Sequence, residues 1–142
     1  SCYEPIDAGL TRAGHRMVEA FDREGVLIDI SHVGNVTGRD ACEASRNPIA
    51  ITHGNPYSFC EAPRNKPMDL IEAVAARGGI VGCTFYPLFA GGAGTTREQY
   101  CEMLYDLAER IGGDHVAIGT DAVLGCAPDA LGRQRLLCQL RS

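Results

Sequence analysis

Two histidines and an aspartate each end a run of mainly apolar residues in this sequence. His32 ends the run LIDISH, His53 ends the run PIAITH, and Asp121 ends the run HVAIGTD. If the three runs are parallel strands of one sheet, their polar ends gather at one edge, because parallel strands point the same way. In parallel α/β folds that edge is where ligands bind and catalysis takes place. The spacing therefore predicts a metal site or a catalytic site.

A histidine at the end of a buried strand has two interpretations. Neutral imidazole binds zinc or a similar divalent ion, and a carboxylate such as Asp121 can complete or activate that site. The same histidine can also be satisfied by an ordinary hydrogen bond, and the sequence GTD can be only a loop cap. The equivalent positions of His32 and His53 favour the metal interpretation. His15 lies on a predicted helix and His115 lies at the opposite, N-terminal end of its strand, so neither is a candidate ligand.

Arg64 lies in the sequence APRNKP, in a proline-rich loop that follows the second histidine. A guanidinium in such a loop can hold a substrate carboxylate through two parallel hydrogen bonds. The alternative is an exposed arginine in a polar loop.

Helices and strands alternate along the chain. The predicted elements are, in order, a helix at 11–25, a strand at 26–32, a helix at about 37–46, a strand at 48–53, a helix at 68–79, a strand at 80–85, a helix at 95–111 and a strand at 115–121. A further helix from Pro128 is interrupted by a glycine, so residues 122–142 carry the weakest signal.

Three threonines are the predicted starts of helices. Thr11 is a candidate N-cap, and Thr37 and Thr95 resemble capping boxes with Asp40 and Glu98 three residues later. The run at 26–32 is rich in Val, Leu and Ile and is expected to be a strand buried on both faces.

The alternation of elements predicts an α/β fold with a parallel sheet and right-handed crossovers. Four such strands are half of an eight-stranded (β/α)8 barrel. Residues 1–142 are thus predicted to be one partial domain.

The composition excludes several classes of protein. The formal net charge is -5, without the clustered Lys and Arg that nucleic acid requires. No run reaches the roughly 18 apolar residues of a membrane span, and the first residues lack the features of a signal peptide. The seven cysteines include no C-x-x-C pair. Free thiols of this kind are typical of a reducing compartment, so we expect a cytoplasmic protein.

Three stretches of the chain resemble one known family. GLTRAGHRMVEAFDREGVLIDISHV resembles the part of the membrane (renal) dipeptidase family that runs GLT-x-G, a helix, and then G-x-x-x-D-x-S-H. RNPIAITHGNPYSFCEAPRNKPMDLIEAVAARGGIVG resembles the next part, with its strand-ending SH or TH, its RN and its GG before a strand. DHVAIGTD resembles the family's last barrel strand. The resemblance covers about residues 9–121, in order.

This resemblance implies a zinc-dependent dipeptidase on a (β/α)8 barrel, with two metal ions bridged by a glutamate. His32 and His53 match the two histidines that hold the second ion. Arg64 matches the arginine that binds the terminal carboxylate of the substrate. Asp121 matches the aspartate that faces the substrate and the activated water.

The chain also departs from the family's pattern. The family's first metal is held by an H-x-D pair on the first strand, its bridging glutamate comes from the third, and a substrate-binding histidine lies upstream as well. None of these motifs is in the sequence, which matches the second half of the barrel, and DAVLG stands where the family commonly has D-F-D-G.

Three functions are compatible with such a half-barrel. The first is a part of a metal-dependent dipeptidase that acts on dipeptides or similar small amides once the N-terminal half is supplied. The second is a half-barrel without chemistry that pairs with a second copy or another chain through its open edges. The third is a related metal-dependent amidohydrolase with another substrate. Arg64 discriminates between them, because only a substrate with a free carboxylate needs it.

Overall fold

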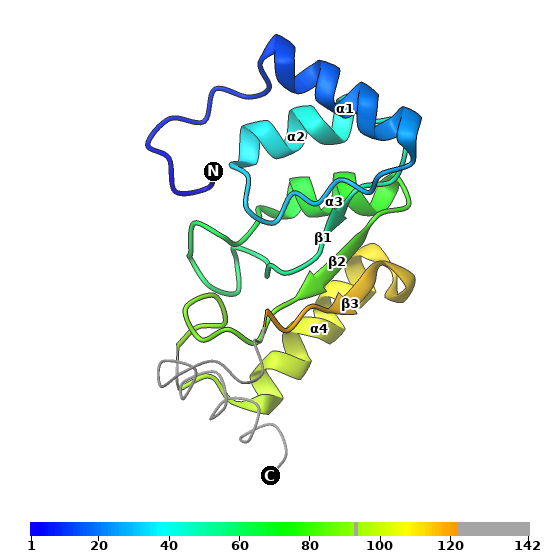
Figure 1. Ribbon diagram of the computed structural model, residues 1–142. Helices are drawn as coiled ribbons and strands as arrows, with labels where there is room; N and C mark the ends of the chain where they lie inside the picture. Colours follow the sequence, from blue (N-terminus) through cyan, green and yellow to red (C-terminus); the bar gives the residue numbers. More distant parts are fainter. Residues whose placement is uncertain (93, 122–142) are drawn as a thin grey trace, which may run out of the picture.

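The computed structural model describes residues 1–92 and 94–121 of the chain, and a parallel sheet lies at its centre. Strands β1 (Ala50–Ile51), β2 (Ile80–Cys83) and β3 (Val116–Ile118) follow one another across the sheet in that order (Figure 1). Both pairings are parallel, so the carboxyl ends of the three strands lie at the same edge.

The strand predicted at 26–32 is reduced to a parallel bridge between Asp29 and Ala50. Backbone hydrogen bonds of 2.8 and 2.9 Å flank this bridge, so the segment runs beside β1 in the direction that the sequence predicts. The prediction of burial on both faces was wrong for the start of the run, where Val26 is 47% and Leu27 60% exposed. Strand β1 has only two residues, and it pairs with the middle of this segment, residues 28–30, and not with its start.

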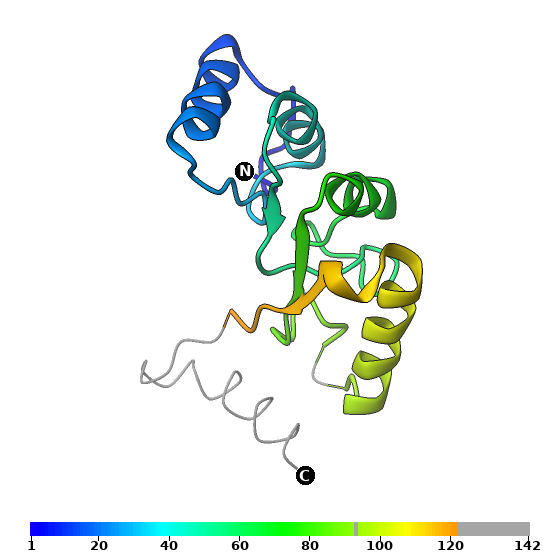
Figure 2. The ribbon, with the colours of Figure 1, turned by 90° about the vertical axis from the view of Figure 1, so that its right-hand side faces the viewer.

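The helices form a layer over one face of the sheet (Figure 2). They are α1 (Arg12–Glu24), α2 (Asn35–Ala44), α3 (Met68–Ala76) and α4 (Arg97–Ile111). Helix α3 packs on β2 and α4 packs on β3, while α2 contacts α3 and α1 contacts α2. The buried core between helices and sheet includes Ile49, Ile51, Leu70, Ile71, Val74, Val81, Cys83, Tyr100, Met103 and Leu107. The described residues therefore form an α/β fold with parallel strands.

Of the described α-helices, the first and the last begin with threonine caps. The hydroxyl of Thr11 accepts a hydrogen bond from the backbone N–H of Gly14 at 3.1 Å, which confirms the predicted start of α1. Helix α4 begins one residue later than predicted, because Thr96 forms a reciprocal capping box with Gln99. Thr95, the predicted cap, precedes that box.

Helix α2 is capped from a distant part of the chain. It begins at Asn35, so Thr37 lies inside its first turn, and the prediction that Thr37 is the N-cap was wrong. The carboxylate of Asp7 accepts hydrogen bonds from the backbone N–H groups of Val36 and Thr37 at 2.6 and 3.1 Å, and from the Thr37 hydroxyl at 2.6 Å. Asp40 accepts instead from the backbone N–H of Leu10 at 2.8 Å. Two carboxylates thus attach the N-terminal segment to this helix.

The strands end earlier than predicted. After β2, the backbone N–H of Thr84 donates to the Asn55 side chain at 3.0 Å, so it does not pair with a neighbouring strand. His115 lies in a 3-10 turn before β3, and its Nδ1 donates to the carbonyl of Gly79 at 2.8 Å, as expected for a structural histidine. The helix predicted from Pro128 lies outside the described residues.

Two glycines bring the strand ends close together next to the second histidine. A side chain at Gly82 or Gly119 would collide with the carbonyl group of Thr52. Their lack of a Cβ allows the backbone around Thr52 to lie against the neighbouring strands, which fixes the place from which the His53 side chain emerges. No helix among the described residues is long and apolar enough to cross a membrane.

We expect Asp7→Ala to lower the free energy of unfolding by about 1 kcal/mol, the usual cost of losing a helix cap. Burial raises the pKa of Asp7, but the hydrogen bonds from Thr37 and its neighbours outweigh burial and lower it overall. The stability that Asp7 contributes is therefore present above about pH 4, and it is lost as the pH falls through the pKa of Asp7 in the folded protein. Urea unfolding followed by circular dichroism measures both effects.

Glu4→Ala is the matched control, because Glu4 is an exposed carboxylate in the same N-terminal segment. Equal loss of stability in the two variants would show that Asp7 does not cap the helix.

Candidate metal centre

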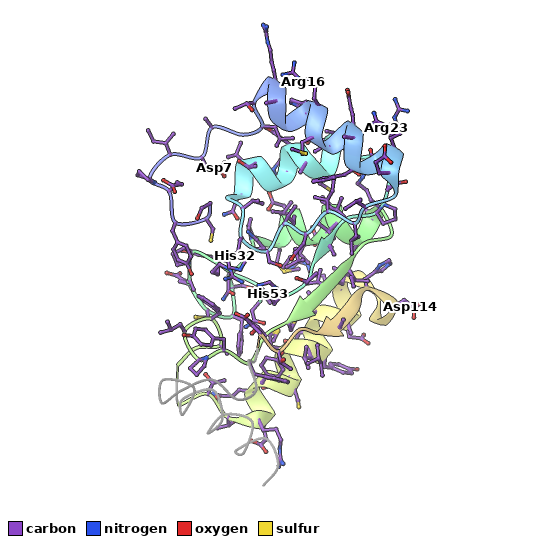
Figure 3. The ribbon with its side chains drawn as sticks, viewed as in Figure 1. Asp7, Arg16, Arg23, His32, His53 and Asp114 are labelled. Atoms are coloured by element: carbon purple, nitrogen blue, oxygen red, sulfur yellow. The ribbon has the colours of Figure 1, made fainter. Side chains whose placement is uncertain are left out.

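His32 and His53 lie side by side at the carboxyl-terminal edge of the sheet (Figure 3). Their Nε2 atoms are 3.1 Å apart, and the ring centroids are 5.1 Å apart with an angle of 61° between the rings. His32 is exposed and His53 half-buried. Both rings therefore reach the edge at which the sequence predicts a site.

The separation of the two Nε2 atoms is close to that required by one shared metal ion. Two nitrogens that each lie about 2.0–2.1 Å from a tetrahedral zinc ion are about 3.3–3.4 Å apart. Among residues 1–92 and 94–121, no group of three or more His, Cys, Asp or Glu side chains is arranged to hold a metal. The geometry of the two histidines thus fits part of a metal site, with two of the ligands that such a site needs.

The far side of the His53 ring is held by a hydroxyl group and a carboxylate. Nδ1 of His53 lies 2.7 Å from the hydroxyl of Thr52, and this hydroxyl donates to Oδ2 of Asp29 at 2.5 Å. Histidine ligands of metals commonly donate their second ring N–H to a polar group that fixes the ring. The surroundings of His53 have this arrangement.

Asp29 also belongs to this cluster, although it was not among the residues predicted from the sequence. It accepts hydrogen bonds from the backbone N–H and hydroxyl of Ser31 and from the backbone N–H and hydroxyl of Thr52, at 2.5 to 3.1 Å. Burial raises the pKa of Asp29, but these four donors outweigh it and keep the pKa below its ordinary value. The sequence feature that could have identified Asp29 is the D-x-S-H motif, in which this aspartate lies three residues before His32.

Arg64 points toward the histidines, as its position after the second strand predicts. The side chain is 3% exposed, which excludes the alternative of a solvated loop arginine. Its Nε donates to the carbonyl of Ser31 at 3.2 Å, its Nη2 to the carbonyl of His53 at 3.1 Å, and its Nη1 lies 3.3 Å from Nδ1 of His32. The guanidinium also lies 5.0 Å from the centre of the Phe89 ring.

Desolvation and nearby positive charge favour the neutral form of His32, which is the charge state that binds metals. Burial lowers the pKa of His32, and the positive charge of Arg64 and the neighbouring His53 lower it further. The carboxylates of Asp121 and Asp29 oppose this shift without reversing it. Asp121 follows β3, so this residue lies at the same edge of the sheet, and its backbone has a left-handed φ of 50°.

Two amide side chains hold the long loop that carries Arg64. Asn55 donates to the carbonyls of Thr84 and Phe89 at 3.0 and 2.8 Å. Asn65 donates to the carbonyls of Cys60 and Phe89, both at 2.8 Å. Both asparagines are buried, and neither was predicted to hold this loop. They order a segment whose three prolines predict an irregular loop.

Lys66 is a second buried cation beside the site. Its side chain is fully buried, and Nζ donates to the carbonyl of Val33 at 2.6 Å. Desolvation is the largest cause of the lowered pKa of this lysine. Arg64 and Lys66 together bind the carbonyls of residues 31 and 33, on either side of His32.

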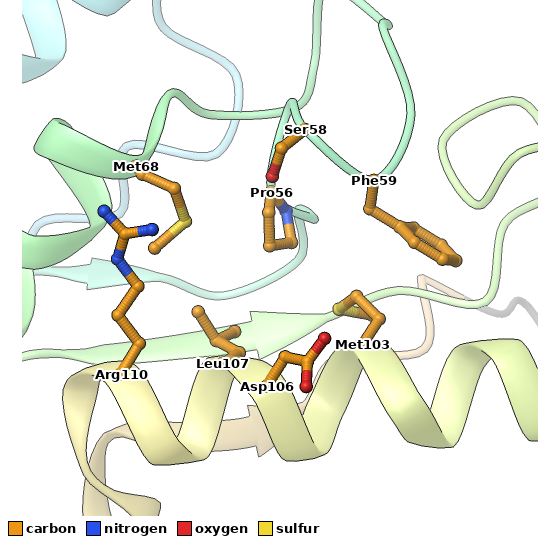
Figure 4. Close-up of a pocket in the computed structure, with 8 residues that line it drawn as sticks. All are labelled: Pro56, Ser58, Phe59, Met68, Met103, Asp106, Leu107 and Arg110. Carbon is orange, nitrogen blue, oxygen red and sulfur yellow. The ribbon is translucent and has the colours of Figure 1, made fainter.

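A hollow of about 300 Å³ lies away from the histidines, between α4, the start of α3 and the loop near Phe59 (Figure 4). Its apolar lining includes Met68, Met103 and Leu107. Arg110 at its rim forms an ion pair of 2.6 Å with Glu72. The residues that line this hollow include none of the predicted site residues.

Comparison with known proteins agrees with the resemblance in the sequence. Dipeptidase verJ of Clonostachys rogersoniana is 32% identical over 117 residues, which are 82% of this chain and 30% of that protein. Dipeptidase aclJ of Aspergillus oryzae is 30% identical over 125 residues, which are 83% of this chain and 29% of that protein. The chain thus spans less than a third of the length of these curated relatives.

Solved structures match the fold over almost the whole chain. An amidohydrolase from Pseudomonas aeruginosa superposes with a TM-score of 0.82 at 34% identity, over 92% of this chain and 40% of that one. A metallo peptidase from Rhodobacter sphaeroides, liganded with a phosphinate mimic of the dipeptide L-Ala-D-Ala, superposes with a TM-score of 0.77 at 27% identity, over 96% of this chain and 41% of that one. The model of the membrane dipeptidase family (peptidase family M19) matches residues 2–140, and the chain belongs to this family.

Proposed function

We propose that the chain is part of a metal-dependent dipeptidase and that His32 and His53 bind one of its metal ions. The observation that carries this proposal is the distance of 3.1 Å between the two Nε2 atoms at one edge of the sheet. Membership of the dipeptidase family supports the same function. Zinc is the ion we propose, because imidazole nitrogen is among its preferred ligands. When bound, such an ion polarises a carbonyl group and makes hydroxide available near neutral pH.

We propose that further metal ligands come from the other half of the barrel, outside these 142 residues. Catalytic zinc sites usually have three protein ligands plus water, and the two histidines supply two. The sheet supports the corresponding architecture, half of a (β/α)8 barrel. It has four parallel segments, with helices over one face and an unpaired edge on each side among the described residues. The remaining half of the barrel, or a second copy, is the partner that these edges fit.

Arg64 is the proposed binding group for the terminal carboxylate of a dipeptide. A guanidinium has five N–H donors, and the contacts to Ser31, His53 and His32 engage three of them. One donor on each terminal nitrogen then remains for a carboxylate. A neutral His32 that binds an ion through Nε2 carries its hydrogen on Nδ1, so Nη1 of Arg64 has to leave Nδ1, which frees the guanidinium further.

Asp121 is the proposed catalytic carboxylate, which orients the substrate or accepts a proton. Its support is its place after β3 and its electrostatic effect on His32. The preceding residue is tied to the neighbouring strand, because the hydroxyl of Thr84 donates to the carbonyl of Thr120 at 3.3 Å.

A related amidohydrolase with another substrate is the second candidate function, and the similarity to the Pseudomonas aeruginosa amidohydrolase favours it. The buried, site-facing Arg64 supports the dipeptidase instead, because a neutral amide has no group for this cation. A non-catalytic assembly unit does not need two imidazoles within reach of one ion.

The first test measures zinc binding and hydrolysis in an enzyme that contains this chain with its complete barrel. We expect His32→Ala and His53→Ala each to weaken zinc binding and to abolish hydrolysis of a simple dipeptide. His15→Ala is the control, because His15 is exposed on α1. The isolated 142-residue chain is expected to show no turnover with zinc. Turnover by this chain alone, or unchanged zinc affinity in both histidine variants, would place the active site elsewhere.

The second test concerns Arg64. We expect Arg64→Lys to raise KM for dipeptides roughly tenfold or more, because one charged hydrogen bond contributes about 1.5 kcal/mol or more. Arg39→Lys is the matched control, since Arg39 forms a surface ion pair with Asp69. Steady-state kinetics with a dipeptide and with its C-terminal amide distinguish the dipeptidase from the related amidohydrolase, because only the dipeptide has a free carboxylate for Arg64. An unchanged KM in the Arg64 variant would remove this residue from substrate binding.

A further inference from the structure

Asp29 lies between the two strand ends that carry the histidines. Its carboxylate accepts hydrogen bonds from Ser31, which immediately precedes His32, and from Thr52, which immediately precedes His53. We propose that Asp29 is a positioning residue that sets the His53 tautomer through the Thr52 hydroxyl. The importance of Asp29 for metal binding rests on the function proposed above. Its effect on the His53 tautomer does not depend on that function.

The direction of each hydrogen bond follows from the chemistry of the groups. A carboxylate only accepts, so the single hydroxyl hydrogen of Thr52 is donated to Asp29 at 2.5 Å. The oxygen of the same hydroxyl then accepts from Nδ1 of His53 at 2.7 Å. The neutral His53 ring thus carries its hydrogen on Nδ1. The lone pair of Nε2 is left on the side that faces His32, where an ion would bind.

The same arrangement satisfies the contact between the two rings. Arg64 is always a donor, so Nδ1 of His32 accepts from it at 3.3 Å. His32 then carries its hydrogen on Nε2 and donates it to Nε2 of His53 at 3.1 Å. One set of proton positions thus satisfies every contact from Arg64 to Asp29, with both imidazoles neutral.

Ser31 adds a second connection between Asp29 and the backbone of His53. Its hydroxyl donates to Asp29 at 2.6 Å and accepts from the backbone N–H of His53 at 3.1 Å. Asp29 therefore acts on both the backbone position of His53 and the tautomer of its ring. A carboxylate that only stabilised the strand pairing would have no need of the hydroxyl that contacts Nδ1.

The test compares Thr52→Val, which removes the hydroxyl and keeps the shape of the side chain, with Thr52→Ser, which keeps the hydroxyl. The first readout is the ¹⁵N chemical shifts of the His53 ring in the metal-free 142-residue chain, at a pH where the rings are neutral. We expect the Nδ1–H form in the wild type and in Thr52→Ser, and a shift toward the Nε2–H form in Thr52→Val. Asp29→Asn should shift the tautomer in the same direction, and it replaces Thr52→Val if that variant does not fold.

The second readout is zinc affinity by calorimetry. Loss of a group that orients a metal ligand typically weakens metal binding about 10- to 100-fold, and we expect this loss in Thr52→Val with recovery in Thr52→Ser. An unchanged His53 tautomer in both Thr52→Val and Asp29→Asn would overturn the proposal, whatever the zinc affinity. A tautomer that shifts in the two variants, together with a wild-type chain whose histidines do not bind zinc, would support the positioning role of Asp29 and contradict the proposed metal function.

Discussion

The parallel pairing of Asp29 with Ala50 determines where both histidines lie. It sets the register between the first strand segment and β1, so that His32 and His53, each three residues beyond this pair, emerge at the same edge. A slip of one residue would turn one imidazole to the opposite face of the sheet. The side chain of Asp29 binds the residues that precede both histidines, so the residue that defines the register also holds the site. The relative position of the two imidazoles depends on this one pairing.

Two buried cations maintain the turn around His32 at an energetic cost. Desolvation of Arg64 and Lys66 is unfavourable, and it is offset by hydrogen bonds to backbone carbonyls of the same turn. The asparagines at positions 55 and 65 hold the loop from which both cations project. The positive charge also disfavours protonation of His32, so the packing around this ring favours a neutral imidazole.

Much of the fold could be predicted from local patterns. The order of the elements, the parallel sheet and the Thr11 cap follow from alternation and capping residues, and the structure confirms them. Interactions between distant residues could not be predicted in this way. The cap of α2 comes from Asp7, which is 28 residues before the helix starts, and the short strands follow from side chains such as Asn55 that compete for backbone groups. The proximity of the histidines could be predicted because equivalent strand ends are adjacent in a parallel sheet, whereas the role of Asp29 depends on side-chain contacts.

The most direct measurement of the central claim is a crystal structure of the zinc-loaded protein, with anomalous diffraction recorded on both sides of the zinc absorption edge. We predict an anomalous peak about 2.0–2.1 Å from Nε2 of both His32 and His53, with Nδ1 of His53 still against the Thr52 hydroxyl. A zinc peak that contacts neither ring, or rings that have turned away from each other in the loaded protein, would contradict the assignment of this edge as the metal site.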